Sequence, residues 1–233
     1  MTTAVQVRVE ALLAGVARPY TRPGSLSAID KRPLDGAVEI GGLGLAGDEQ
    51  GDTRVHGGPD KALHHYPFDH YAAWLDELGA LPVLEAPGAF GENISTRGIT
   101  EADVCLGDRF ELGTAVLEVS QGRQPCWKLN DRFAVPRMAR LVQDTGRTGW
   151  DYRVLQPGEA RAGDLLRLAA RPHPDWPLVR LMRLLAERVL DPVQLGAALE
   201  LPLVPSGRKL VERRLASSQV EDWGRRVDGP PQN

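Results

Sequence analysis

The sequence VCLGDRFELGTAVLEVS, residues 104–120, indicates a β-rich fold. Its apolar residues form short runs that are interrupted at Gly107-Asp108 and again at Gly113, which is typical of β-hairpins. Similar short or alternating apolar runs recur on both sides of this stretch, at Val5, Val7 and Val9, at Tyr152, Val154 and Leu155, and at Leu165, Leu166 and Leu168. Many short strands with regular turn signals predict a mainly β protein, a barrel or a sandwich.

Two helices are expected inside this β-rich part. Residues 67–79 begin with Pro67, which suits a first helical turn, and carry apolar side chains on one face. Residues 131–144 carry a second helical pattern, and Pro136 predicts an irregular first turn there.

The chain changes character at residue 171. Prolines recur within residues 172–177 and predict a semi-rigid linker, after which the apolar spacing becomes helical. We expect three short helices. The first covers residues 178–190, the second begins at Pro192 after the cap Asp191, and the third begins at a Ser206 cap. The predicted domains are a barrel over residues 1–170 and a small three-helix domain over 171–233, with a frayed tail over 228–233.

Composition excludes several classes of protein. The 233 residues carry a formal net charge of −3, and 25% are charged and 42% hydrophobic, which excludes disordered and fibrous proteins. Two cysteines are too few for a disulfide framework or a four-cysteine zinc site. We find no secretion signal and no apolar run of the ~18–20 residues that a membrane helix needs, so we expect a cytoplasmic protein without a membrane partner. The lack of a basic excess argues against a nucleic-acid partner.

The segment 120–126, SQGRQPC, is the most informative candidate site. It follows a predicted strand, begins with Ser120 and ends at Cys126, three residues after Arg123. A nearby guanidinium favours the thiolate, which is either a nucleophile or a soft metal ligand. The alternative is a buried cysteine that packs as a small hydrophobe, and the loop position favours function. The other cysteine, Cys105, lies in a strand pattern and is interpreted as packing.

Three further stretches leave both readings open. His56 precedes Gly57 and Gly58, and paired glycines allow backbone N–H groups to cradle an anion, but a tight loop with a structural histidine is the favoured interpretation of this motif when it is taken alone. Asn93 offers an amide to a polar ligand or caps a turn. Arg153 lies in a predicted strand and faces either an anion or solvent.

Taken in order, five stretches resemble the MOSC domain family, in particular its YiiM-like stand-alone bacterial members of the N-hydroxylaminopurine resistance type. They are SAIDKRP (27–33), GLAGDEQGDTRVHGGPDKALHHYP (44–67), GAFGENIS (88–95), SQGRQPCWKL (120–129) and GWDYRVL (149–155). The C-terminal part is similar to the small helical domain that such proteins carry. Two positions depart from the expected pattern, because Gly122 replaces a proline and Asp151 replaces an aromatic residue.

The resemblance implies a MOSC-type β-barrel that binds a pyranopterin molybdenum cofactor, with Cys126 as the protein ligand of the metal. It implies reduction of N-hydroxylated compounds, such as hydroxylaminopurine-type bases and amidoximes, with electrons from a separate flavoprotein. His56 is the expected proton donor. The expected cofactor contacts are Lys31, Arg54, His56, Gly57, Gly58, Asn93, Ser120, Arg123 and Arg153.

Other functions remain open at this point. The protein is alternatively a carrier of the cofactor, or of sulfur on Cys126, without its own turnover. A cysteine hydrolase using Cys126 and His56 lacks an oxyanion motif. Pyridoxal phosphate is not expected, because the chain has no room for that fold beside a barrel.

Overall fold

Within the part of the chain that the computed structural model describes, residues 5–52 and 57–230, seven strands close into a barrel. The strands are β1 (Gln6–Ala14), β7 (Leu63–Pro67), β8 (Ile94–Thr96), β9 (Arg109–Leu112), β10 (Ala115–Gly122), β11 (Trp150–Gln156) and β13 (Leu165–Ala170). Their order is β13-β9-β10-β11-β7-β8-β1, and β1 pairs with β13 to complete the wall. The pairs are antiparallel except β7 with β8, which is parallel. The predicted barrel is therefore confirmed.

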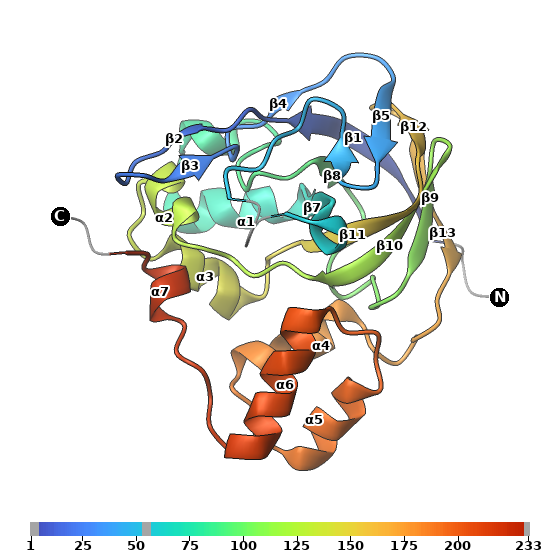
Figure 1. The fold of residues 1–233 in the computed structure, drawn as a ribbon. Coiled ribbons are helices and arrows are strands. Elements are labelled where there is room, and N and C mark those ends of the chain that lie inside the picture. The colour runs from blue at the N-terminus through green and yellow to red at the C-terminus, as the bar shows by residue number, and fades with distance from the viewer. Residues whose placement is uncertain (1–4, 53–56, 231–233) are drawn as a thin grey trace.

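Small strands decorate the barrel (Figure 1). They are β2 (Arg18–Pro19), β3 (Leu26–Ser27), β4 (Arg32–Pro33), β5 (Val38–Gly41), β6 (Gly44–Leu45) and β12 (Gly158–Ala160). β4 extends the barrel sheet beside β1, whereas β12, β5 and β6 form a separate sheet and β2 pairs with β3. Two 3₁₀ turns complete this part of the chain, η1 (Pro59–Lys61) between β6 and β7 and η2 (Pro82–Leu84) before β8.

The stretch that predicted the fold forms a hairpin only in part. β9 and β10 pair antiparallel around Gly113, as expected. Residues 104–106 form a buried turn instead of a strand, because the Asp108 carboxylate accepts a hydrogen bond from the Cys105 N–H at 2.9 Å and so holds the turn. Cys105 is 2% exposed and lies outside the described strands, where it forms an isolated antiparallel β-bridge with Pro177.

The helices inside the barrel sequence differ slightly from expectation. α1 (Asp69–Leu78) begins two residues after Pro67, which belongs to β7. The single helix expected over 131–144 is two helices, α2 (Lys128–Phe133) and α3 (Met138–Thr145). The break lies at Ala134, which has a left-handed backbone with φ of 52°, and Pro136 follows it.

The C-terminal region contains the three expected helices, α4 (Leu178–Ala186), α5 (Pro192–Leu199) and α6 (Pro205–Ser217), and α7 (Gly224–Val227). Asp191 caps α5 as predicted, whereas α6 begins after Val204, not at a Ser206 cap. Leu181, Leu195 and Val211 belong to the same buried cluster as the barrel interior, so the three helices dock on the barrel.

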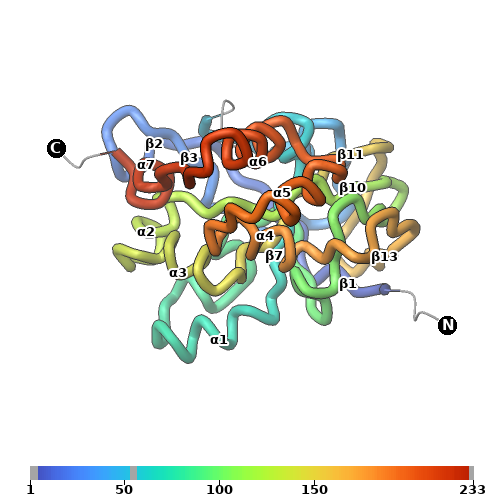
Figure 2. The backbone as a smooth tube through the Cα atoms, turned by 90° about the horizontal axis from the view of Figure 1, so that it is seen from below, coloured from blue at the N-terminus to red at the C-terminus, as the bar shows by residue number. Residues whose placement is uncertain are grey.

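After α6 the chain returns to the barrel (Figures 1 and 2). α7 lies beside α2 in both views, and Arg22 donates hydrogen bonds to the carbonyls of Asp228 and Pro230 at 2.9 and 2.5 Å. The expectation of a frayed tail is therefore wrong for residues 228–230. Among the described helices, none has the length and apolar character needed to cross a bilayer.

Candidate functional site

Cys126 lies in the loop between β10 and α2 and is 6% exposed. Neither it nor Cys105 forms a disulfide within the described chain. The loop is fixed at its start by the Arg123 N–H, which donates to the Gly149 carbonyl at 3.1 Å, and at its end by the Leu129 N–H, which donates to the Cys126 carbonyl at 3.0 Å. A buried thiol is thus held at the edge of the barrel.

Strand register places a row of polar residues beside this loop. Gln121 on β10 is paired with Asp151 on β11, and Asp151 is paired with His64 on β7. Successive side chains of a strand point to opposite faces, so Asp151 and His64 lie on the opposite face from their buried neighbours Trp150 and His65. Gln121 Nε2 donates to Asp151 Oδ2 at 2.7 Å, which links the row.

Two nitrogen atoms at this row lack a hydrogen-bond partner among the described residues: Arg123 Nη1 and His64 Nδ1, both fully buried. A buried polar atom without a partner costs about 1–3 kcal/mol, so a ligand or water bound at this row would satisfy both nitrogen atoms. Arg123 is close enough to His64 and Asp151 to influence the pKa of each. The unsatisfied atoms therefore belong to one site.

Positive charge surrounds Cys126. Burial lowers the pKa of Lys128 and of Arg226, and the nearby Cys126 opposes that lowering in both. Arg123 acts on the same two groups, so Cys126 and Arg123 share their cationic neighbours. A thiol, two guanidinium groups and one buried ammonium group suit a soft metal carried by an anionic organic ligand. The residues present thus fit a pyranopterin molybdenum cofactor with its phosphate.

The titratable groups of the row are displaced from their usual pKa values. Burial, and then the charge of Arg123, hold the pKa of His64 well below its usual range, so the imidazole is neutral at neutral pH. Burial raises the pKa of Asp151, while Arg123 and the hydrogen bond from Gln121 work in the opposite direction. The site therefore contains a neutral imidazole and a carboxyl group that retains its proton to a higher pH than an exposed aspartate.

A second group of polar side chains is hydrogen-bonded to the backbone of His64 and links the barrel to its surrounding loops. The Lys31 ammonium is buried and paired with the Asp48 carboxylate. Asn93 Nδ2 donates to Asp48 Oδ2 at 2.8 Å and to the Leu13 carbonyl at 3.1 Å, and Asn93 Oδ1 accepts from the His64 N–H at 3.1 Å. The structure thus places the predicted contacts Lys31 and Asn93 next to the row, with their polar groups engaged by the protein.

Two other predicted contacts, Ser120 and Arg153, lie around η1. Ser120 Oγ is within hydrogen-bond distance of the Asp60 and Asp151 carbonyls, at 2.6 and 2.9 Å. Arg153 is paired with Asp60 at 2.8 Å and with Glu118 at 3.0 Å.

The glycine loop is described in part. Gly58 has φ of 95° and open space where a side chain would be, and Gly57 precedes it. Arg54 and His56 lie outside the described residues.

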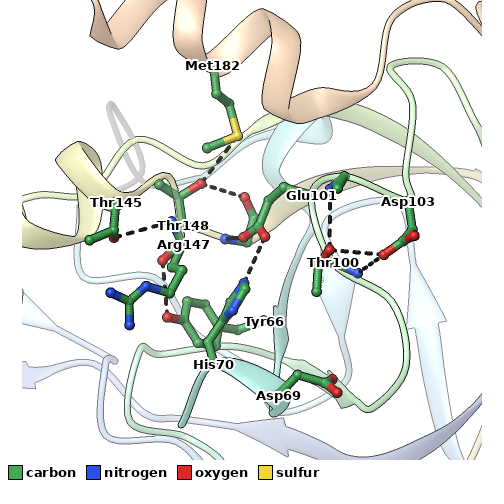
Figure 3. A network of polar contacts seen from close by, with 12 residues as sticks. Tyr66, Asp69, His70, Thr100, Glu101, Asp103, Thr145, Arg147, Thr148 and Met182 are labelled. Atoms are coloured by element: carbon green, nitrogen blue, oxygen red, sulfur yellow. Dashed lines mark hydrogen bonds and ion pairs between the residues drawn. The ribbon is translucent and has the colours of Figure 1, made fainter. Parts of the chain in front are cut away.

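Figure 3 shows a network of polar contacts around Glu101 and Thr148. This network fixes Gly149, whose carbonyl accepts from the Arg123 N–H. Glu101 accepts from the Gly149 N–H at 2.6 Å and lies 2.8 Å from His70 Nε2. Gly149 has φ of 70°, and an added Cβ would collide with the His65 carbonyl. Figure 3 also shows Met182 of α4 reaching Thr148, whose hydroxyl is 3.6 Å from Sδ.

Sequence reasoning missed several residues of this site. No role was predicted for His64 or Asp151, and register along β7 and β11 is the signal that would have placed them together. Lys128 lies two residues after Cys126 and was within reach of the same motif. Arg226 gave no sequence signal, because it comes from α7, a hundred residues further along the chain. Among the described residues, no group of three or more histidine, cysteine or acidic side chains has the arrangement of a metal site.

The fold defines a β-barrel protein with an appended helical domain, and Cys126 lies at the centre of its candidate ligand site. Residues 52–167 match the MOSC domain model, and residues 176–218 match the YiiM-like 3-alpha helix domain. The chain is 41% identical over 207 residues to Protein YiiM of Escherichia coli K12, covering 88% of this chain and 92% of that protein. The chain belongs to the MOSC domain family, with the C-terminal domain of YiiM-like members.

Further relatives agree in fold. The crystal structure of YiiM from Escherichia coli has a TM-score of 0.79 at 34% identity and covers 94% of this chain and 98% of its own. YiiM from Geobacillus stearothermophilus has a TM-score of 0.76 at 31% identity and covers 90% and 99%. A protein of Gibberella moniliformis named "Reductase" is 39% identical over 193 residues, which are 82% of this chain and 34% of that protein.

Proposed function

We propose that this protein is a molybdenum-cofactor-dependent reductase of N-hydroxylated compounds, including hydroxylaminopurine-type bases and amidoximes. The observation that carries the proposal is the buried Cys126 beside two buried nitrogen atoms, Arg123 Nη1 and His64 Nδ1, that lack partners in the described chain. Membership in the MOSC family and the name of the fungal relative support an oxidoreductase.

When bound, the cofactor supplies a two-electron reduction in which N–OH and two protons become N–H and water. The electrons come from a separate flavoprotein. Cys126 binds the metal through its thiolate, and Arg123, His64 and Lys128 bind the anionic organic part. Burial raises the pKa of Asp151, so its carboxyl group takes up a proton more readily than an exposed aspartate does. His56, which lies outside the described residues, remains the predicted proton donor.

The decisive experiment compares the two cysteines. Wild type, Cys126→Ala and Cys105→Ala are expressed in a host that makes the cofactor, and bound molybdenum and N-hydroxylaminopurine reduction with an artificial electron donor are measured. We expect Cys126→Ala to lose both metal and activity while its thermal midpoint moves by no more than about 2 °C. Cys105→Ala should lose about 1 kcal/mol of stability and keep its activity per folded molecule.

The outcomes separate the alternatives. Wild-type protein without molybdenum, from a host whose cofactor pathway is verified, contradicts the proposal. Protein that is loaded with molybdenum but turns over none of several N-hydroxy substrates indicates a carrier instead. Retained activity in Cys126→Ala excludes this thiolate as an essential ligand.

A further inference from the structure

The C-terminal strap, residues 221–230, leaves the three-helix region and returns to the barrel beside the Cys126 loop (Figures 1 and 2). It contains α7 and follows directly on the chain that leaves α6. Its contacts connect the three-helix region to the Cys126 loop, and the proposed function gives no role to this connection.

Arg226 of the strap contacts the peptide groups on both sides of Cys126. Its Nη1 donates to the Pro125 carbonyl at 2.5 Å, and its own carbonyl accepts from the Trp127 N–H at 2.8 Å. Its Nη2 donates to Gln143 Oε1 of α3. One residue thus fixes the backbone immediately before and after the candidate metal ligand and ties it to α3.

The strap is anchored to the barrel at further points. Asn130 Nδ2 of α2 donates to the Val227 carbonyl at 2.8 Å. Asp228 is paired with Arg140 of α3 at 2.5 Å, and its carbonyl accepts from Arg22 at 2.9 Å. These contacts hold α7 against α2 and α3, so Arg226 is presented to the loop from a fixed element.

The other end of the strap is tied to the three-helix region. Arg214 of α6 is 1% exposed and binds the Glu221 carboxylate at 2.8 and 3.0 Å. The same guanidinium donates to the Leu184 and Leu185 carbonyls of α4 at 3.1 and 2.9 Å. Trp223 Nε1 also donates to Glu221, at 2.6 Å. Polar contacts therefore run without a gap from α4 to the strap.

The three-helix region also contacts the start of the same loop. Met182 of α4 packs so closely on Gly122 that an added Cβ would lie 2.7 Å from its Cγ and 2.8 Å from its Sδ. Met182 of α4 thus occupies the space that a side chain at position 122 would need. The loop is held by Met182 at its beginning and by Arg226 around Cys126.

We propose that Arg226 is a positioning residue for the metal-binding loop, and that the three-helix region serves to hold the strap and the loop in register. This inference rests on the proposed function, because it gives the loop its purpose. Arginine suits the role because its planar fork reaches Pro125 and Gln143 together, which the single ammonium of lysine cannot do with the same geometry.

The test measures amide hydrogen exchange in metal-free protein, so that it requires no turnover. Arg226→Ala should speed exchange in the peptide 122–130 by about tenfold, the weight of about one hydrogen bond that keeps the loop closed. The peptide 104–112, which contains the Cys105 turn, should be unchanged. Arg225→Ala, an exposed position on the same helix, is the matched control and should resemble wild type.

Arg226→Lys should recover part of the protection, because it keeps the charge and one donor. In cofactor-loaded protein, Arg226→Ala should lower kcat and leave KM within about twofold, because substrate contacts are intact while the ligand is displaced. Equal acceleration in both peptides, no acceleration in either, or the same effect from Arg225→Ala would overturn the proposal. Local acceleration in a protein without turnover supports the strap and contradicts the proposed reaction alone.

Discussion

The neighbouring histidines on the two faces of β7 differ in the hydrogen bonding of their rings. His65 points into the barrel, where Nδ1 lies 3.1 Å from the Tyr152 hydroxyl and Nε2 lies 2.8 Å from Thr96 Oγ1. His64 lies on the other face, where Nδ1 has no partner within the described chain and Arg123 is near. Both side chains are buried, so burial does not distinguish core from site. The ring nitrogens do differ between these two histidines, because both have a hydrogen-bond partner in His65, whereas Nδ1 of His64 has none among the described residues.

The largest expected effect is on the interior face. His65→Ala removes two hydrogen bonds, leaves two buried hydroxyls unsatisfied and opens a cavity, so we expect a loss of about 3–5 kcal/mol in the free energy of unfolding at pH 7. Denaturant unfolding monitored by tryptophan fluorescence measures it. Activity per folded molecule should be unchanged.

The same variant has a signed pH dependence. Burial lowers the pKa of His65 to about 3, whereas the unfolded ring titrates near its ordinary value of 6.5. Between these values the unfolded state binds more protons, so wild-type stability falls as pH falls from about 6.5 towards 3. The variant lacks this contribution, and its deficit against wild type should narrow in acid. A deficit that is constant from pH 7 to pH 4 contradicts a neutral, buried His65.

The next largest effect is on the site face. Arg123→Gln should reduce retention of the molybdenum cofactor by about a hundredfold, because it removes a buried charge that meets an anionic ligand. Its thermal midpoint should stay the same or rise, since Nη1 has no partner among the described residues. Bound molybdenum per chain after gel filtration measures retention.

The matched control is Arg153→Gln. Arg153 is already paired with Asp60 and Glu118. Its replacement should therefore lower the stability of the protein and leave the amount of bound molybdenum per chain close to that of wild type. An Arg123 variant that unfolds more easily but keeps its molybdenum would place Arg123 with the scaffold, together with His65.

The contrast also explains what the sequence could predict. The β9–β10 hairpin and the C-terminal helices were visible because their signals are local: apolar period, turn residues and the Asp191 cap. β7 and β8 were missed, since β8 has three residues and β7 carries two histidines in a continuous buried run. The break after α2 was anticipated only as irregularity, because the left-handed Ala134 has no sequence signature.

The candidate site divides in the same way. Cys126 and Arg123 were found together because one short loop carries both. Arg226 arrives from the far end of the chain, and its role depends on how the three-helix region docks. Lys31 and Asn93 were identified from their motifs, but the partner that occupies them, Asp48, is brought in by the folding of separate loops.

The smallest expected effect carries the opposite sign to that of His65. Because burial raises the pKa of Asp151, the folded state binds more protons than the unfolded state between the ordinary aspartate pKa and this raised value. Ionisation of Asp151 therefore lowers stability as pH rises through that window, and Asp151→Asn should be the more stable protein at pH 7. The advantage should disappear as pH falls below about 4, where both states of the wild type are protonated. Denaturant unfolding across pH 4–7 measures it, with Asp164→Asn, a change at a less buried turn, as the control.

If Asp151→Asn is instead less stable at every pH, its carboxylate is a structural partner of Gln121 and Arg123, and the row holds no proton for the reaction. A stabilised variant with reduced turnover would show that this face of β7, unlike the interior face, accepts a cost in stability for its chemistry.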